Sequence, residues 1–392
     1  MNFVLDKNTF LWEGSQQALF YNCANAKYKV VQFGNSQIRA FVRSILAIEN
    51  FSVCKIDGDI MPLALVLSRE GFGRVVPEGV VDFQLPKIPL INTSVERIPE
   101  DKRKYIITNW FNLSSYINSV TIYSGGKSKK CDLYKQMPYP IDSRVALNVD
   151  SIVAFINEVH AINNSTRFNI AISDLKQFAT YSFLHLSECI TSLITLYVRK
   201  EALDERLLEL FIIKGFDVKV IVDSPTDFNE SECLSGVSYV FLINSETALE
   251  KYEEISVAIP GIKMEPIYIV DDNAEFIKNT IFTTKQEILK NKATKQLIYT
   301  HQHINTFNWG KIYVLHNGEV CTDMIRQNKI GVISDNLQDL IAEEMVQNFA
   351  WRQIRKYETC LKCVCRWLCP SPTPYERLLN AQTICLDNSA EL

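Results

Sequence analysis

The stretch that decides the interpretation of this chain is Cys360–Glu376, with the sequence CLKCVCRWLCPSPTPYE. It holds Cys360, Cys363, Cys365 and Cys369, and Cys385 follows after a short interval. Two prolines, Pro370 and Pro372, prevent a regular helix through the loop. Iron–sulfur clusters need four thiolates on irregular backbone, where turns aim the sulfurs at one centre and free amides reach them. The spacing Cys-x2-Cys-x5-Cys with a distal cysteine therefore predicts a four-thiolate metal site.

Spacing alone leaves two metals open for this site. A structural zinc site also uses four thiolates and CxxC pairs, so zinc and an iron–sulfur cluster fit the pattern equally well. The chain shows no export signal, and cytosolic thiols stay reduced, so we expect no disulfide framework. The other cysteines are scattered, and each is expected to be a buried, inert thiol: Cys23, Cys54, Cys131, Cys189, Cys233 and Cys321.

The segments before the cysteines favour a particular family. Asn317–Gly318 predicts a hairpin turn between strands at Lys311–Leu315 and Glu319–Met324, and a long amphipathic helix is predicted at Leu337–Tyr357. A hairpin with a cysteine after its turn, then a long helix, then this cysteine pattern resembles the SPASM extension of radical-SAM peptide maturases. Cys360–Glu376 closely resembles the end of maturases and pseudo-radical-SAM proteins of Bacteroidales peptide-modification systems.

This resemblance implies one auxiliary [4Fe–4S] cluster, with these ligands: Cys360, Cys363, Cys369 and Cys385. Cys365 has no place in the family pattern. A second auxiliary cluster would use Cys321, but Asn336 and Thr373 stand where the family has two further cysteines. The resemblance therefore implies a single cluster.

The middle of the chain alternates short apolar runs with helical stretches, and fully covered parallel strands have this composition. The helical stretches include Ile152–Ile162, Glu205–Ile213 and Thr247–Ile255. Six such units predict an α/β fold with a partial (β/α)6 radical-SAM-like barrel over residues 96–298. The predicted strands are Val120–Tyr123, Phe168–Ile172, Ser192–Val198, Val218–Val222, Val237–Leu242 and Ile267–Val270.

The loop after the first predicted strand lacks the cysteines of a radical-SAM enzyme. The family motif CX3CX2C holds a cluster through three thiolates and leaves one iron open for SAM. With Cys131 as the middle ligand, Lys127 and Tyr134 fill the other positions, and with Cys131 as the last ligand, Ser124 and Ser128 fill them. One thiolate cannot hold the cluster, so we predict a pseudoenzyme that does not cleave SAM. Ser173–Asp174–Leu175 likewise replaces the GGE-like turn that binds the methionyl amine in the family.

Other interpretations of the chain are weaker. Gly125–Ser128 after a strand is similar to a P-loop, but the leading glycine would fall at Thr121 inside the strand, and Pro138 disfavours the helix that must follow. His301 and His303 lack a third ligand nearby, so a metal site there is not predicted.

The first 95 residues predict a small α+β domain. Strands are expected at Leu19–Tyr21, Tyr28–Phe33 and Phe51–Ile56, and Asn35 or Ser36 can cap a helix. A second helix is expected at Pro62–Glu70, and a linker contains Pro86, Pro89 and Pro99. The unit resembles the winged domains that bind precursor leader peptides as an added edge strand. A structural cap on the barrel is an equally good interpretation.

Charge and composition exclude some partners. The net charge is −4, and the basic residues are not clustered beyond the short run Lys127–Lys130, so nucleic acid is not expected as a partner. No apolar segment is long enough to cross a membrane, and a cytoplasmic location is expected.

These features together predict an inactive, radical-SAM-like partner that binds a maturase, its precursor peptide, or both. Residues 299–392 would form its cluster domain. Electron transfer to a radical-SAM partner, a zinc-stabilised binding protein, and an enzyme with unrelated chemistry are the alternatives.

Overall fold

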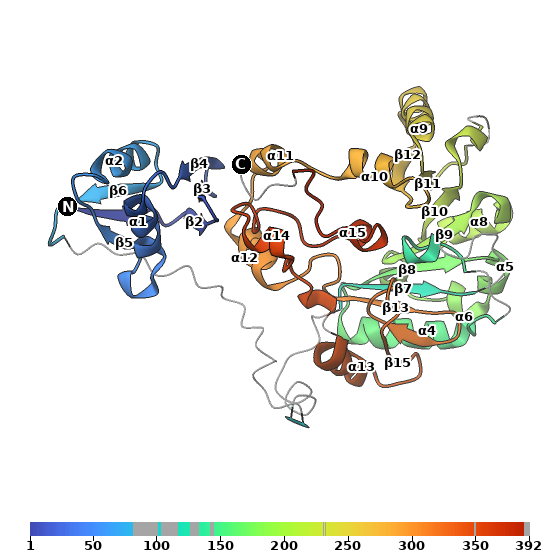
Figure 1. Ribbon diagram of the computed structural model, residues 1–392. Coiled ribbons are helices and arrows are strands. Elements are labelled where there is room, and N and C mark those ends of the chain that lie inside the picture. The colour runs from blue at the N-terminus through green and yellow to red at the C-terminus, as the bar shows by residue number, and fades with distance from the viewer. Residues whose placement is uncertain are drawn as a thin grey trace.

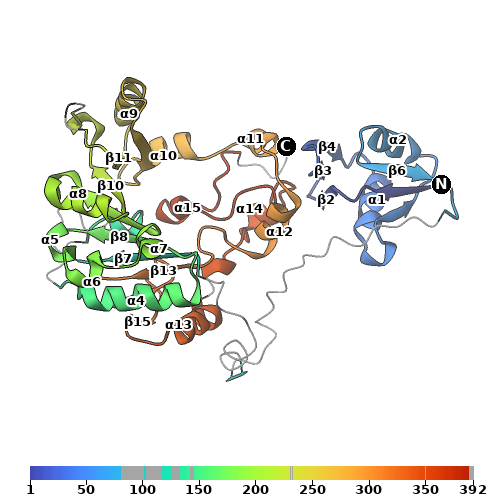
Figure 2. The same ribbon diagram turned by 180° about the vertical axis from the view of Figure 1, so that it is seen from behind.

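The computed structural model describes residues 1–80, 101–102, 117–125, 133–141, 145–229, 231, 233–348 and 350–387. Within these ranges the chain is a mixed α/β protein with one nine-stranded sheet and two three-stranded sheets. The two small sheets form an N-terminal unit at one end of the molecule, and the large sheet lies at the other end (Figure 1). Helices α11 (Lys285–Lys290), α12 (Lys295–His303) and α14 (Glu358–Leu361) lie between them in both views (Figure 2).

The large sheet has the strand order β12-β11-β10-β9-β8-β7-β13-β14-β15. The strands from β12 to β13 pair in parallel, and β14 and β15 add in antiparallel fashion. Their bounds are β7 (Ser119–Tyr123), β8 (Arg167–Ile172), β9 (Ile194–Arg199), β10 (Asp217–Val222), β11 (Ser238–Ile243), β12 (Lys263–Tyr268), β13 (Lys311–Val314), β14 (Glu319–Cys321) and β15 (Lys329–Val332).

One face of this sheet is the main hydrophobic core. Val120, Ile170 and Leu196 are fully buried on it and pack with residues of α4 (Val149–Ile162), α8 (Glu205–Ile213) and α9 (Glu246–Ala258). Because successive side chains of a strand point to opposite faces, the alternate residues lie on the other side of the sheet. Shorter helices complete this part of the chain: α5 (Leu175–Phe178), α6 (Tyr181–Leu184), α7 (Glu188–Thr191) and α10 (Ala274–Ile281).

All six predicted parallel strands are present, and the three predicted helices correspond to α4, α8 and α9. The prediction of Ile267–Val270 for the last strand is wrong in its bounds, because β12 begins at Lys263. Pro266 lies within β12, although proline has no N–H group to donate to a neighbouring strand. It is tolerated there because β12 is at the edge of the sheet. A mixed α/β fold is therefore confirmed, whereas the partial (β/α)6 barrel stays a prediction.

The hairpin around Asn317–Gly318 is confirmed as β13 and β14. β13 also pairs in parallel with β7, so the hairpin extends the large sheet across the predicted boundary at residue 298. The boundaries 1–95, 96–298 and 299–392 stay predictions.

The long helix predicted at Leu337–Tyr357 is wrong. Helix α13 (Leu337–Glu343) is followed by a π-helical turn at Glu344–Asn348 and a 3₁₀ turn at Ala350–Arg352. Carbonyl groups beyond α13 are hydrogen-bonded by a distant segment: Asn308 Nδ2 donates to the Ala350 carbonyl at 3.1 Å, and Asn305 Nδ2 donates to the Gln353 carbonyl at 2.9 Å. These contacts replace the i to i+4 bonds that a longer helix needs.

The N-terminal unit contains the sheets β2-β3-β4 and β5-β1-β6. Helix α1 (Ser36–Leu46) begins as predicted, with the Asn35 side chain accepting a hydrogen bond from the Ile38 amide, and α2 spans Met61–Arg69. The predicted strands correspond to β3, β4 and β5, whereas β1, β2 and β6 were not predicted. The predicted linker prolines lie outside the described residues. The strand bounds are β1 (Asn2–Leu5), β2 (Thr9–Glu13), β3 (Gln17–Asn22), β4 (Lys27–Gln32), β5 (Val53–Lys55) and β6 (Gly73–Val76).

Candidate metal centre

The five clustered cysteines line one cavity of about 60 Å³. A cavity needs at least roughly 10–15 Å³ of such volume to hold one water molecule, so this space admits a group larger than a single small ligand atom. The cavity wall also contains three basic side chains, Lys285, Arg355 and Arg366, and the carboxylate of Asp387. The cysteines are Cys360, Cys363, Cys365, Cys369 and Cys385.

Tight turns and one long-range strand contact bring these thiols together. The Cys363 amide donates to the Cys360 carbonyl at 3.2 Å, and the Cys369 amide donates to the Cys365 carbonyl at 3.0 Å. Cys385 arrives from a separate segment, where it forms an isolated parallel bridge with Thr283 at the start of α11. The Thr283 amide donates to the Ile384 carbonyl at 3.0 Å, which fixes this bridge.

Two buried cations lie beside the thiols. Lys285 is 3% exposed and Arg355 is 2% exposed, and both line the cavity. Positive charge beside a thiol favours its ionised form, so Lys285 and Arg355 suit a site that becomes negatively charged when thiolates form. Burial opposes the charged form of Arg355, but the thiolates of Cys369 and Cys360 and the carboxylate of Glu376 raise its pKa. The positive charge of these two side chains therefore favours thiolates in this cavity.

The thiol pKa values diverge within the cavity. A hydrogen bond from Cys365, helped by Lys285 and Arg355, lowers the pKa of Cys363 to about 6 against the effect of burial. The same hydrogen bond, together with burial, raises the pKa of Cys365. Burial raises the pKa of Cys369 to about 12, although Arg355 opposes it, and burial also raises the pKa of Cys385. Cys363 is thus the thiol among these four that ionises most readily.

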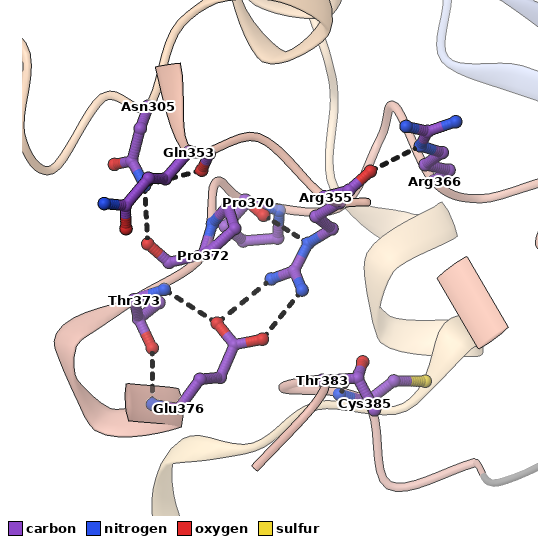
Figure 3. Close-up of polar contacts among 10 residues, drawn as sticks. All are labelled: Asn305, Gln353, Arg355, Arg366, Pro370, Pro372, Thr373, Glu376, Thr383 and Cys385. Carbon is purple, nitrogen blue, oxygen red and sulfur yellow. Dashed lines mark hydrogen bonds and ion pairs between the residues drawn. The ribbon is translucent and has the colours of Figure 1, made fainter. Parts of the chain in front are cut away.

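Arg355 also fixes the backbone around the cavity (Figure 3). Its Nε donates to the Pro370 carbonyl at 2.6 Å, and its own carbonyl accepts from Arg366 Nε at 2.8 Å. Glu376 accepts from both Nη atoms of Arg355 and from the amide of Thr373. Thr373 and Glu376 form a capping box for α15 (Pro374–Leu378). The loop that carries Cys369 is therefore attached to a capped helix.

The donor set fits an iron–sulfur cluster or zinc, since thiolates prefer these metals. In the described ranges, no three His, Cys, Asp or Glu side chains stand together in a way that would bind a single metal ion. The structure brings the four predicted ligands to one cavity, and their ligation stays a prediction.

The residues expected around a second auxiliary cluster serve other purposes. Cys321 lies in β14, is 1% exposed, and packs near Tyr123 and Met324, and burial raises its pKa to about 11. The Asn336 side chain caps α13 by accepting from the Gln338 and Asp339 amides, and Thr373 caps α15. Of these positions, none lines the cavity of the five cysteines.

The degenerate SAM-cluster loop lies largely outside the described residues, including Lys127, Ser128 and Cys131. Tyr134 is described within a short 3₁₀ turn, where its hydroxyl accepts from Gln327 Nε2 at 2.8 Å. The hydroxyl of Ser124 donates to the Ala171 carbonyl at 3.0 Å. Ser173 Oγ donates to the Gly125 carbonyl, which joins the ends of β7 and β8.

The N-terminal unit packs against the cysteine segment, a contact that the sequence did not reveal. Phe10 and Leu19 share a buried cluster with Val364, Cys365 and Leu368. Lys285 was also missed, because nothing near it in the sequence resembles a ligand motif. Arg355 was missed as well, although it lies only five positions before Cys360.

Comparisons with known proteins give weak similarities. No protein-family model matches the sequence, and no curated protein matches it. Solved structures of SuiB from Streptococcus suis are similar at 11% identity and a TM-score of 0.39, covering 97% of this chain and 99% of SuiB. SuiB bound to precursor peptide SuiA is similar at 11% identity and a TM-score of 0.39, covering 98% of this chain and 100% of SuiB. SuiB bound to S-adenosylmethionine is similar at 10% identity and a TM-score of 0.36, with the same coverage of both chains. These values are too low to support an argument about fold or function. Among the described helices, none is both long and apolar enough to cross a bilayer.

Proposed function

We propose that this chain is a catalytically inactive, radical-SAM-like partner protein in ribosomal peptide maturation. It carries one [4Fe–4S] cluster on Cys360, Cys363, Cys369 and Cys385, and it binds a radical-SAM maturase, the precursor peptide, or both. The observation that carries this proposal is the single cavity lined by these four thiols and by the buried cations Lys285 and Arg355.

The residues around the cavity have defined roles in this proposal. Arg355 and Lys285 offset the negative charge of the thiolates, which lowers the cost of holding several of them in a buried place. The hydrogen bonds from Arg355 to Pro370 and Glu376 keep the loop in one conformation. A bound [4Fe–4S] cluster would supply a covalent cross-link between distant segments and a one-electron redox centre.

The absence of catalysis is proposed from the sequence of the loop after β7. That loop contains a single cysteine, Cys131, whereas SAM cleavage in the family requires three thiolates at one cluster. The anaerobically prepared chain should release no 5′-deoxyadenosine from SAM in the presence of a strong reductant. Release of 5′-deoxyadenosine by the purified chain would refute the inactive assignment.

Association with a partner is tested by co-purification. The tagged chain would be co-expressed under anaerobic conditions with a candidate radical-SAM maturase and a candidate precursor peptide. We expect the maturase to be retained on the tag and its turnover of the peptide to depend on this chain. A maturase that neither binds the chain nor changes its rate when the chain is absent would remove the proposal. Cys54 lies away from the cavity, so Cys54→Ser is the control for the Cys360→Ser variant used in the next test.

Electron transfer to the partner is the second candidate function, because a [4Fe–4S] cluster at this site would be a one-electron redox centre. A partner maturase that works equally well with a cluster-free Cys360→Ser chain would exclude electron transfer while leaving the binding role intact.

A further inference from the structure

A second cavity, of about 280 Å³, lies on the face of the large sheet opposite the main core. Strands β7, β8, β9 and β13 at the centre of the sheet supply its floor. The lining residues that belong to these strands alternate with core residues such as Val120, Ile170 and Ile312, so they lie on the other face. These strand residues are polar or aromatic: Ser119, Thr121, Tyr123, Asn169, Tyr197, Lys311 and Tyr313.

The walls of this cavity are held by specific hydrogen bonds. The side-chain amide of Gln136 exchanges two hydrogen bonds of 2.8 Å with the backbone of Val270, which ties the segment after β7 to the end of β12. The Tyr123 hydroxyl donates to the Tyr134 carbonyl at 2.9 Å. On the other side Arg377 of α15 forms an ion pair with Asp323, whose side chain is fully buried. The cavity is therefore a built feature of the fold.

Lys311 is a cation of this cavity that has no acidic partner among the described residues. It is the first residue of β13 and is partly buried. Two other cations line the cavity: Arg377 pairs with Asp323, and Lys135 lies over the ring of Tyr134. Lys219 of the neighbouring strand β10 pairs with Glu265 at 2.7 Å. Burial lowers the pKa of Lys311, and no nearby charge opposes this effect. An unpaired ammonium group in a cavity is destabilising, so its presence there points to a ligand that supplies the missing negative charge.

Hydrogen-bond donors accompany the ammonium group. Within the described part of the chain, the hydroxyl groups of Thr121 and Tyr313 have no hydrogen-bond partner, and both residues line the cavity. Asn169 Nδ2 donates to Ser119 Oγ at 3.3 Å, which leaves the Ser119 hydroxyl hydrogen available to a ligand. The Lys311 ammonium group, together with several neutral donors, matches the charge and the acceptor count of one carboxylate.

We propose that this cavity binds a single carboxylate of a peptide, either an acidic side chain or the C-terminal carboxylate, through Lys311 with Thr121, Ser119 and Tyr313. The volume of about 280 Å³ is near the lower end of the usual range of small-molecule pockets, about 300–1,000 Å³, and it accommodates an acidic side chain. Tyr197 and Tyr313 provide apolar ring surface for the methylene groups of such a side chain. The identity of the peptide as a maturation precursor rests on the proposed function, whereas the carboxylate site does not.

The test uses the full chain prepared anaerobically and two small probes, N-acetyl-glutamate amide and N-acetyl-glutamine amide. Saturation-transfer NMR and calorimetric titration would measure their affinities. We expect the glutamate probe to bind at least tenfold more tightly than the glutamine probe, and Lys311→Met to abolish this preference. Lys311→Arg should retain part of the preference, and Lys251→Met, at an exposed lysine paired with Glu254, should not change it. Equal binding of both probes, or an unchanged preference in Lys311→Met, would overturn the proposal.

Folding of the variant is checked separately. Removing an unpaired buried charge should leave the melting temperature of Lys311→Met unchanged or raise it, so loss of binding cannot be attributed to unfolding. The free glutamate anion, added as a third probe, distinguishes a metabolite site from a peptide site, because a site for a free amino acid would prefer it to the capped probe. If the chain prefers the glutamate probe but does not associate with a maturase, the proposed function fails and the carboxylate site stands. If the chain associates with a maturase but shows no preference for the glutamate probe, the carboxylate site fails and the proposed function stands.

Discussion

The guanidinium group of Arg355 and the carboxylate of Glu376 are joined by two hydrogen bonds of 2.7 and 3.3 Å, and their side chains are only 2% and 1% exposed. This ion pair connects the wall of the thiol cavity to the N-terminal cap of α15. Removing one partner of a buried pair leaves a buried charge without compensation, which costs about 3–5 kcal/mol.

We therefore predict that Glu376→Gln lowers the free energy of unfolding by about 3 kcal/mol and speeds the loss of bound metal. Urea denaturation under anaerobic conditions measures the first effect, and metal release to a chelator measures the second. The exposed pair Lys362–Glu358, at 2.7 Å, provides the control, and Lys362→Ala should change neither quantity. If the two variants behave alike, the Arg355–Glu376 pair does not organise the cavity.

A tyrosine hydroxyl adds hydrogen bonds to the packing between the N-terminal unit and the rest of the chain. Tyr21 Oη accepts from the Ala293 amide at 2.8 Å and lies 3.4 Å from the Asn291 carbonyl, to which it donates. Tyr21→Phe leaves the buried Ala293 amide without a partner, so we expect a loss of about 1–3 kcal/mol in unfolding free energy. Tyr28 lies opposite Tyr21 on β4 and is 43% exposed. Tyr28→Phe should be neutral in the same thermal and urea measurements, and an equal loss in both would contradict the proposed contact.

Two glycines with the same backbone conformation should differ in their tolerance of a side chain. Gly71 has φ of +86° with open space where a Cβ would stand, and Gly125 has φ of +84°, where a Cβ would meet the Val145 carbonyl oxygen. Gly71→Ala should cost about 1 kcal/mol from the conformation alone. Gly125→Ala should cost clearly more, because the backbone after the β7 loop must also move. Equal melting temperatures for the two variants would show that the contact around Gly125 is not tight.

His301 should contribute a pH-dependent term to stability. Its Nδ1 lies 3.1 Å from the Trp367 carbonyl, and burial lowers its pKa below the ordinary value of 6.5. The unfolded chain then binds the proton more readily, so stability is complete above pH 6.5 and falls as the pH drops toward the folded pKa. The slope from this group is at most about 1.4 kcal/mol per pH unit. The free energy of unfolding of the His301→Gln variant should therefore change less with pH between 5 and 7 than that of the original chain. Substitution of the exposed His185 by Gln should leave this pH dependence unchanged.

Local patterns predicted most of the large sheet. Helix α8 spans Glu205–Ile213 as expected, and the Asn35 cap sets the start of α1, because capping and apolar periodicity act over a few residues. The end of α13 could not be predicted in this way. The segment after it is held in a non-helical path by hydrogen bonds from Asn308 to the Ala350 carbonyl and from Asn305 to the Gln353 carbonyl, which are 42 and 48 residues apart in the sequence.

In the candidate site, too, the residues placed by local spacing could be predicted and those placed by distant contacts could not. The spacing of Cys360, Cys363 and Cys369 was sufficient to place three thiols in one loop. The position of Cys385 depends on its bridge to Thr283, and Lys285 enters the cavity from that same distant segment. Contacts between residues far apart in the sequence do not produce a motif with fixed spacing, because the length of chain between the two residues can vary freely.

The iron and acid-labile sulfide content of the anaerobically reconstituted chain tests the proposed cluster more directly than any other quantity. We expect about four iron and about four sulfide per chain. Cys360→Ser, Cys363→Ser, Cys369→Ser and Cys385→Ser should each lower both values, whereas Cys365→Ser and Cys54→Ser should not. A colourless protein that binds one zinc ion without sulfide, or one that binds no metal, would rule out the [4Fe–4S] assignment.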